Sequence, residues 1–333
     1  MLRTLIFFIL ACAAASAAQK TADFFFVDVE GGQATLIVSP SGQSLLIDTG
    51  WPGHEGRDAE RIAAAAKQAG LKKIDYVLIT HFHTDHVGGV PQLTQRIPVG
   101  TFIDHGPSVE HGKDEDALFQ AYAKERDKAK HIEVRPGDTV PLKGIGVRVL
   151  TAGGKQIDKP LAGAGEKNAL CGTEQRRPTD ESENAQSVGT LITFGKFRAV
   201  DLGDLTWNKE MDLMCPVNRV GKVDVYIVTH HGMNMSGSAT GVYPLAAKVA
   251  IMDNGAKKGG TPEAYQVIRK SPGLADIWQL HYAESGGDGN NTDEKLIANL
   301  KGGEDKGYAI KLSAHEDGTF SVTNLRSGFS KSY

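Results

Sequence analysis

Short apolar segments rich in β-branched and aromatic residues open the chain after residue 20 and predict a set of β-strands. These segments lie at 24–27, 34–38 and 44–48. A helix is expected over 57–69, because apolar residues fall on one of its faces and Gly70 stands where its C-terminal cap belongs. The nearly all-apolar run at 74–80 is typical of a strand buried on both faces.

The second half of the chain repeats this order of elements. Strands are expected there at 188–194, 197–200 and 223–230, and the C-terminal third continues with a strand at 249–252, a helix at 262–270, a strand at 277–280 and a hairpin over 308–314 and 319–323. In both halves a hairpin ends near an aspartate, Asp48 or Asp204, and the next buried strand ends in Thr-His, at His81 or His230. The repetition predicts two related β-rich halves whose strand ends point His and Asp residues at one place.

A polar stretch rich in Gly, Lys, Glu and Asn separates the two halves at 153–186. A connection of this length inside a compact domain is usually functional or disordered. Length alone leaves one or two domains open. We expect one domain over 18–333 that contains this insert.

The first 17 residues have the features of a cleavable signal peptide. Arg3 supplies positive charge, 5–15 is an unbroken apolar run, and 15–17 offers the small residues that signal peptidase reads. The run is too short to span a membrane, which takes about 20 apolar residues. We therefore expect a periplasmic or secreted protein with no transmembrane domain after signal removal. Lipoprotein anchoring at Cys12 is the alternative, because 9–12 loosely resembles a lipobox.

Cysteine usage agrees with export. Removal of the signal leaves Cys171 and Cys215 in an oxidising compartment, which favours a disulfide between them. The alternative is a soft metal-ligand pair, but the two residues lack the C-x-x-C spacing that zinc sites usually show.

The formal net charge is −3, so composition gives no strong nucleic-acid signal. Basic pairs stand at 176–177 and 257–258. They are enough to hold one phosphate but a poor basis for a groove that tracks a nucleic-acid strand.

The segment 81–86, His-Phe-His-Thr-Asp-His, places three imidazoles and a carboxylate directly after a buried strand. On extended backbone His81 and His83 project to the same side and are spaced to bind one metal ion. Asp85 and His86 lie on the turn beyond and can bind a second ion. These ligands suit zinc, with manganese and iron as alternatives. The motif predicts two divalent metal ions as cofactors.

This motif, preceded by Leu-Leu-Ile-Asp-Thr-Gly at 45–50, resembles that of the metallo-β-lactamase superfamily. Further family motifs can be placed at Gly203-Asp204 and at His230-His231-Gly232, so the resemblance covers about residues 23–285. It implies an α/β fold, a four-layer αββα sandwich with the metals at one edge of two sheets.

The resemblance also implies roles for individual residues. Asp204 would bridge both ions, and Asp48 would brace the ligands from behind. Either His230 or His231 would complete the second metal, and the parallel with Thr80-His81 favours His230. The implied metal ligands are His81, His83, Asp85, His86, Asp204 and His230.

Many relatives have a further His ligand for the first metal, and its place in this chain is open. His105 follows an apolar strand at 99–103 and is the best-placed candidate, as a ligand or an active-site residue. His111 lies in a charged segment and His131 at a predicted helix end, so we expect both to be solvated. His281 follows a strand and could also reach the site.

Within the superfamily the chain is most similar to the soluble hydrolase domain of competence-type DNA-uptake proteins. The resemblance rests on 27–34, on Gly-Asp-Leu at 203–205 and on His-His-Gly at 230–232. Two departures put the implied nuclease activity in doubt. Met233 stands where that group usually has Ser, and the membrane-channel portion of the full competence proteins is absent.

We therefore expect an exported hydrolase in which two metal ions activate a water for attack on a phosphodiester or related ester. Asp85 or Asp204 can orient that water, and His231 is the candidate proton donor to the leaving group. The bridging Asp204 favours phosphodiesters, because true β-lactamases typically lack that carboxylate. The expected partner is a small-molecule or exposed ester substrate. The alternatives are a lactone or β-lactam hydrolase, a competence-type nuclease, and a non-catalytic metal-binding protein of the same fold.

Overall fold

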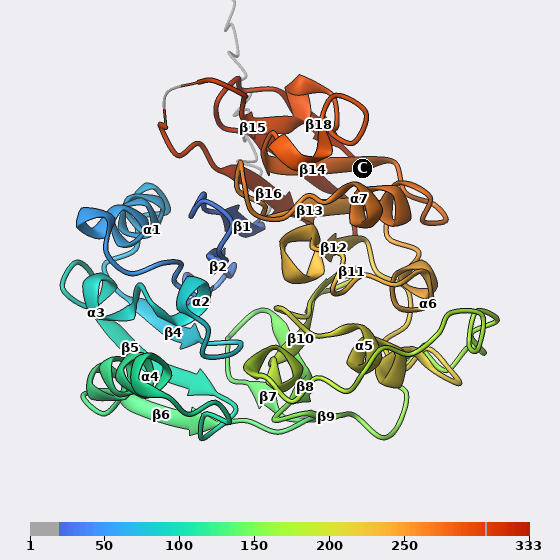
Figure 1. Cartoon of the computed structure of the whole chain (residues 1–333). Helices are drawn as coiled ribbons and strands as arrows, with labels where there is room; N and C mark the ends of the chain where they lie inside the picture. The colour runs from blue at the N-terminus through green and yellow to red at the C-terminus, as the bar shows by residue number, and fades with distance from the viewer. Residues whose placement is uncertain (1–19, 304) are drawn as a thin grey trace, which may run out of the picture.

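The computed structural model describes residues 20–303 and 305–333, and two nine-stranded sheets face each other at its centre (Figure 1). The first sheet runs in the order β18-β17-β16-β1-β2-β3-β4-β5-β6. Its strands are β1 (Ala22–Phe26), β2 (Thr35–Val38), β3 (Ser44–Ile47), β4 (Ile74–Leu78), β5 (Val99–Asp104), β6 (Lys130–Glu133), β16 (Ile310–Ala314), β17 (Phe320–Asn324) and β18 (Ser330–Ser332).

The second sheet runs in the order β15-β14-β13-β12-β11-β10-β8-β7, with β9 paired to β8. Its strands are β7 (Thr139–Val140), β8 (Gly146–Ala152), β9 (Lys155–Gln156), β10 (Gly189–Phe194), β11 (Phe197–Asp201), β12 (Val225–Ile227), β13 (Val249–Met252), β14 (Asp276–His281) and β15 (Ile297–Asn299). Each sheet has a parallel and an antiparallel part. In the first sheet β3, β4 and β5 are parallel, whereas β1, β2 and β3 are antiparallel. In the second sheet β11, β12 and β13 are parallel.

Helices cover the outer face of each sheet, which completes the predicted αββα sandwich (Figure 1). The first sheet is covered by α1 (Arg57–Gln68), α3 (Val90–Leu93) and α4 (Lys113–Arg126), and the short α2 (Thr84–Val87) lies at the strand ends. The second sheet is covered by α5 (Trp207–Met214), α6 (Ala239–Val242) and α7 (Pro262–Arg269). The short 3-10 turns are η1 (His54–Gly56), η2 (Glu183–Gln186), η3 (Thr229–Gly232), η4 (Tyr243–Leu245), η5 (Glu284–Gly286) and η6 (Glu294–Leu296).

Three buried apolar layers hold the sandwich together. The central layer takes side chains from both sheets, including Phe24, Phe197 and Trp278. The two outer layers lie between each sheet and its helices, with Tyr122 in one and Tyr226 in the other. A strand such as β3 is buried on both faces because it contributes to two of these layers, which explains its continuous apolar sequence.

The predicted relation between the two halves is present in the fold. The β2–β3 hairpin is followed by α1 and by β4 parallel to β3, and the β10–β11 hairpin is followed by α5 and by β12 parallel to β11. Both parallel strands lead into the histidine motifs. Because the two halves face each other, the ends of β4 and β12 come to the same edge of the sandwich.

The structure corrects some of the predicted elements. The strand expected at 223–230 is only Val225–Ile227, because the chain turns sharply through η3 at the two histidines. His131 does not end a helix but lies on β6, where its Nε2 is 3.0 Å from both carboxylate oxygens of Asp104. The helix expected to end at His131 is α4, which ends at Arg126, and its mostly polar sequence gives little amphipathic signal to define its range.

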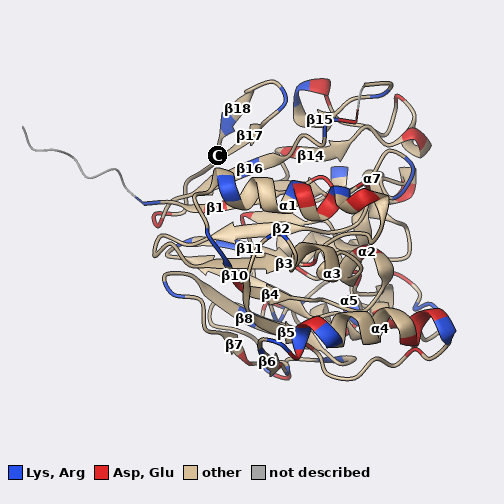
Figure 2. Cartoon of the chain, turned by 90° about the vertical axis from the view of Figure 1, so that its left-hand side faces the viewer, with Lys and Arg blue, Asp and Glu red and all other residues tan. Residues whose placement is uncertain are grey.

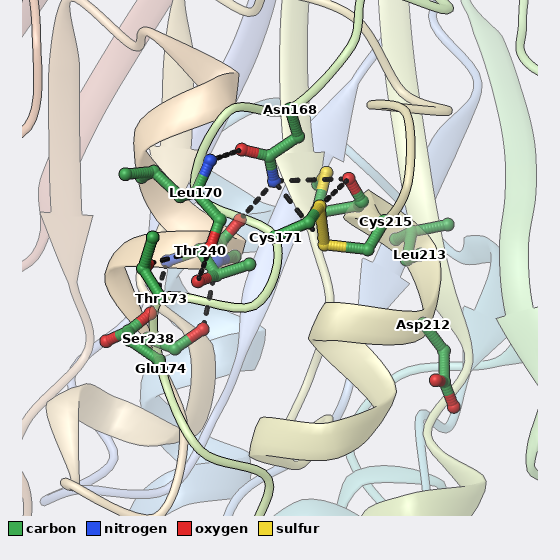
Figure 3. Close-up of a disulfide and its surroundings, with 12 residues drawn as sticks. Asn168, Leu170, Cys171, Thr173, Glu174, Asp212, Leu213, Cys215, Ser238 and Thr240 are labelled. Carbon is green, nitrogen blue, oxygen red and sulfur yellow. Dashed lines mark hydrogen bonds between the residues drawn. A yellow bond between two sulfur atoms is a disulfide. The ribbon is translucent and has the colours of Figure 1, made fainter.

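A disulfide joins Cys171 of the polar insert to Cys215 at the end of α5, as predicted, with 5.8 Å between the Cα atoms (Figure 3). Asn168 reinforces the attachment because its Nδ2 donates to the carbonyl oxygens of Met214 (3.2 Å) and Thr240 (3.0 Å). Glu174 accepts hydrogen bonds from the first backbone amides of α6 (Figure 3). The insert is therefore fixed to α5 and α6 along its length.

Residues 1–17, predicted as a signal peptide, and Cys12 lie outside the described residues. Within the part of the chain that the structure describes, no helix has both the length and the apolar character required to cross a membrane.

We predict that the disulfide contributes substantially to stability. The two cysteines are 44 residues apart in sequence. In the chain-entropy model, cross-linking a loop of this size lowers the entropy of the unfolded state, and this raises the free energy of unfolding by about 4 kcal/mol. The variant Cys171→Ala/Cys215→Ala should therefore lower the free energy of unfolding by up to about 4 kcal/mol in denaturant titrations. Alkylation of Cys171 or Cys215 in unreduced, denatured protein would contradict the pairing.

Candidate metal site

The predicted site residues converge where strands of both sheets end. β4 leads to His81 and His83, and α2 carries Asp85 and His86. On the other sheet β11 leads to Asp204, and β12 leads into the turn that holds His230 and His231. Apart from His83, which is partly exposed, these residues are buried.

His81 and His83 form one side of the site. His81 Nε2 lies 3.1 Å from His83 Nδ1, so the two rings present neighbouring nitrogens as expected for alternate residues on extended backbone. The other nitrogen of His81, Nδ1, is 3.1 Å from the hydroxyl of Thr80. This contact fixes the direction in which Nε2 points.

A tighter cluster forms the other side. It consists of Asp85, His86, Asp204 and His231, whose potential ligand atoms all lie within 4.8 Å of one another. His86 Nε2 is 3.2 Å from Asp85 Oδ2 and 3.3 Å from Asp204 Oδ2. His231 Nε2 is 3.2 Å from Asp85 Oδ2 and 3.3 Å from Asp204 Oδ1.

Both histidines of the His-His-Gly motif face Asp204. His230 and His231 have φ values of 57° and 54°, and two successive left-handed residues turn the chain enough to present both rings. Such strain in non-glycine residues is a common feature of functional sites. His230 Nε2 lies 3.3 Å from Asp204 Oδ2, but only His231 also reaches Asp85 and His86. The geometry therefore favours His231 as the metal ligand, whereas the sequence favoured His230.

The residue before Asp204 has to be glycine for the site to form. Gly203 has a φ of 55°, and a Cβ atom there would lie 2.9 Å from Cβ of Thr80. Its carbonyl oxygen accepts a hydrogen bond from the backbone N–H of His230 (3.0 Å). This close approach brings the His-rich segment 81–86 next to Asp204 and His230.

Two further aspartates stand behind the cluster. Asp48 Oδ2 is 2.7 Å from His86 Nδ1 and accepts a hydrogen bond from the hydroxyl of Thr80, and Oδ1 accepts one from the backbone N–H of Thr80. Asp253 Oδ2 is 3.4 Å from His231 Nδ1. A carboxylate on the far nitrogen of an imidazole fixes the tautomer that a metal needs. Asp48 therefore has the bracing position that the sequence predicted, and Asp253 occupies the equivalent position in the second half.

His105 lies behind the site rather than in the metal cluster. Its Nε2 is 3.0 Å from Oε2 of Glu183, and that same oxygen accepts a hydrogen bond from the backbone N–H of Phe82, between the two motif histidines. Glu110 Oε2 is 3.2 Å from His83 Nε2. The end of the polar insert, through Glu183, thus helps to hold the first histidine pair.

The remaining histidine candidates lie outside this arrangement. His111 is exposed and pairs with Asp116 at 3.3 Å. His281 Nε2 is 2.6 Å from Asp28, which also pairs with Arg61 at 2.9 Å. These residues serve other local contacts.

The ionisable groups of the cluster strongly influence one another's pKa values. Burial alone would raise the pKa of Asp204, but the imidazoles of His231, His86 and His230 lower it well below its usual value. Burial would likewise lower the pKa of His86, and the surrounding carboxylates raise it well above its usual value. Burial lowers the pKa of His81, which favours its neutral form. The buried carboxylates thus require nearby positive charge, whether from imidazolium or from a metal ion.

The residues fit two divalent metal ions. Ligand atoms of one tetrahedral zinc, at bond lengths of about 2.0–2.1 Å, lie about 3.3 Å apart. This agrees with the 3.1 Å between His81 Nε2 and His83 Nδ1 and the 3.2 Å between His86 Nε2 and His231 Nε2. Asp204 Oδ1 is buried and has no hydrogen-bond partner among the described residues, as expected of an oxygen shaped for a cation.

A family model for the metallo-β-lactamase superfamily matches residues 27–161. This part of the chain is similar to the metallo-β-lactamase superfamily. The match and the two facing sheets agree with the predicted fold class, and relatives such as hydroxyacylglutathione hydrolase and ribonuclease Z agree with the predicted enzyme class.

Individual proteins are similar to parts of this chain. ComE operon protein 3 of Bacillus subtilis is 24% identical over 243 residues, which cover 69% of this chain and 28% of that protein. Hydroxyacylglutathione hydrolase of Xanthomonas axonopodis pv. citri is 40% identical over 62 residues, 19% of this chain and 21% of the relative. The chain thus matches about a quarter of the length of these relatives. Among solved structures, the metallo-β-lactamase fold protein YhfI from Bacillus subtilis is 13% identical with a TM-score of 0.45, over 78% of this chain and 96% of that one.

Several residues around this superfamily site were not identified from the sequence. Asp253 follows the buried strand β13 much as Asp48 follows β3, and this parallel could have revealed it. Glu110 and Glu183 stand in polar segments that contain many charged residues, so no pattern distinguishes them. Lys258 had been noted only as half of a basic pair, and the structure places its ammonium group at Asp85 Oδ2.

Glu210 on α5 supports the loop that follows the His-His-Gly motif. Its Oε2 accepts a hydrogen bond from the backbone N–H of Gly237 (2.7 Å). Burial raises the pKa of Glu210 to about 7. A raised carboxyl pKa means that the group stabilises the fold below pH 4.5 and that this contribution is lost as pH rises through about 7.

We predict that Glu210→Gln flattens the pH dependence of stability. Between pH 5 and pH 8 the wild type should lose up to roughly 3 kcal/mol that the variant retains, because the amide cannot ionise. Denaturant unfolding of both proteins at several pH values, at equal metal content, measures the difference. Parallel stability curves would show that Glu210 does not titrate in this range.

We also predict close to two transition-metal ions per chain in the purified protein. The motivation is that six ligand-type residues converge from two sheets, which are too many for one ion. Elemental analysis measures the stoichiometry. Protein that contains no metal and takes up none from zinc or manganese solutions would exclude a metal site here.

Proposed function

We propose that this chain is an exported, dinuclear metal-dependent phosphodiesterase acting on small or exposed substrates. The observation that carries the proposal is the position of Asp204. Its Oδ1 faces His231, and its Oδ2 faces His86 and His230. These contacts place Asp204 at the centre of the cluster, and we propose that its carboxylate also reaches the ion held by His81 and His83.

The residue roles follow from the distances. We assign His81 and His83 to one ion, and Asp85, His86 and His231 to the other, with Asp204 shared between them. His230 then braces Asp204 from the opposite side, where the hydroxyl of Ser236 lies 3.2 Å from its Nδ1. This assignment makes His231 the metal ligand in place of His230, and it leaves the role of proton donor to the leaving group, which the sequence suggested for His231, unassigned.

Two divalent ions held by these residues would supply Lewis acidity for activating a water and polarising the ester. The protein's own contribution is orientation. The carboxylates of Asp85 and Asp204 can accept hydrogen bonds from the attacking water and fix its direction. Asp48 keeps the imidazole of His86 in place through its contact with Nδ1, and the carboxylate of Asp253 lies 3.4 Å from Nδ1 of His231.

Charge at the surface supports a small substrate rather than a long nucleic acid. Arg176 pairs with Asp212 at 2.7 Å, and Arg177 lies 3.9 Å above the ring of Trp207 and donates to the carbonyl of Asn234. One of the two basic pairs is therefore engaged within the molecule. Along α1 and α4, acidic and basic residues both occur (Figure 2), whereas strand tracking needs a continuous basic groove.

Export is supported by the signal-like features of residues 1–17 and by the disulfide between Cys171 and Cys215. Disulfides persist in oxidising compartments and are rare in the bacterial cytosol. We propose that the mature protein is periplasmic or secreted and that zinc is its metal, with manganese or iron as the alternatives.

We predict that a small chromogenic phosphodiester is hydrolysed faster than single-stranded DNA, lactones or β-lactams, and that a chelator abolishes the activity. The control is Asp204→Ala, which should lower the rate at least about 100-fold while circular dichroism stays native, because a bridging ligand acts on both ions.

Three outcomes would contradict this assignment. DNA cleavage that is faster and falls steeply with salt would instead indicate a nuclease of the competence type. Preferred turnover of a lactone or β-lactam would indicate chemistry at an acyl carbon. Activity of Asp204→Ala within tenfold of the wild type would show that Asp204 is not a bridging ligand.

A further inference from the structure

The loop between β13 and α7 forms one wall of the metal site. Its Gly260 donates a backbone hydrogen bond to the carbonyl oxygen of His231 (2.9 Å). The residue before it, Gly259, has a φ of 81°, and a Cβ atom there would lie 2.1 Å from that same carbonyl oxygen. The loop is therefore packed directly on the backbone of a candidate metal ligand. Lys258 belongs to this loop and is held in position together with it.

Lys258 points at the metal cluster. Its ammonium group forms an ion pair with Oδ2 of Asp85 and lies 5.0 Å from the centroid of the Trp51 ring. A backbone hydrogen bond from Gly255 to the carbonyl of Lys258 closes the loop at 2.8 Å. The side chain is 28% exposed, so a ligand that enters from solvent can reach it.

A lysine in this position is electrostatically unfavourable for metal binding alone. Two divalent ions and an ammonium group repel one another, and the repulsion is strong where little water screens it. The carboxylate of Asp85 can balance only part of this charge. The arrangement becomes favourable when an anion is bound between the ions and the lysine, because the anion interacts with all three.

We propose that Lys258 is a substrate-binding residue that contacts a non-bridging, anionic oxygen of the phosphoryl group. The inference rests on the proposed function, since it concerns the substrate of the same site. The indole of Trp51 limits the directions available to the ammonium group through a cation–π contact. Lys258 thereby provides specificity for an oxyanion next to the scissile bond.

The test compares Lys258→Gln with Lys257→Gln. Lys257 is the exposed neighbour in the same loop and has the same charge, so it controls for net charge and for loop damage. Inorganic phosphate is the probe, and its dissociation constant is measured by calorimetry on metal-loaded protein. Metal content and the KM and kcat for a small phosphodiester are measured alongside.

Lys258→Gln should raise the phosphate dissociation constant and KM by at least about tenfold, the loss expected for one charge-assisted hydrogen bond. Its metal content should be unchanged or higher, because a repulsive charge has been removed. Lys257→Gln should behave as the wild type, and Lys258→Arg should recover part of the phosphate affinity.

Two results would overturn the inference. A loss of metal with unchanged phosphate affinity would mean that Lys258 only supports Asp85. Binding of acetate, but not of phosphate, that depends on Lys258 would mean that the site selects a carboxylate instead. If phosphate binding depends on Lys258 but no phosphodiester is hydrolysed, the proposed function fails and the anion site stands.

Discussion

The burial of Asp85 and Asp204 among imidazoles is the interaction on which the rest of the site depends. A carboxylate in a low-dielectric environment needs compensating positive charge, and here the compensation comes from His86, His230 and His231, which surround Asp204. The histidines are in turn oriented by further carboxylates, such as Asp48 behind His86. Positive and negative groups therefore alternate outward from the cluster, and each layer fixes the position of the one inside it.

This charge arrangement requires close backbone approach, which the fold supplies at the edge where the two sheets end. Gly203 lies against Thr80, and its carbonyl accepts from His230, so the two halves of the chain touch at the ligands themselves. The strained backbone at His230 and His231 persists because the surrounding loops hold it, Gly260 among them. The double sheet can maintain such strained backbone because the packed layers behind it are rigid.

The polar insert is part of this support rather than a separate appendage. The disulfide fixes its middle to α5, the helix that begins just after Asp204. Its far end supplies Glu183, which binds both His105 and the backbone between the two motif histidines. An oxidising compartment would thus stabilise a segment that also braces the metal ligands, which links the redox environment of the protein to the geometry of its site.

The sequence by itself determined the fold class and predicted most of the residues that converge at the candidate site. Runs such as 74–80 are apolar on both faces because the strand is buried between layers, and the segment 81–86 has few explanations besides metal binding. Hydrophobic period and ligand spacing are local properties, so they can be read from consecutive residues. Only the tertiary structure distinguishes the positions of His230 and His231, because these depend on how a strained turn directs two adjacent rings, of which His231 reaches Asp85. It also decided that His105 lies behind the site and that Lys258, 173 residues from Asp85 in sequence, lies next to it. Such contacts join segments with no local pattern in common, and only the packing of the two sheets brings them together.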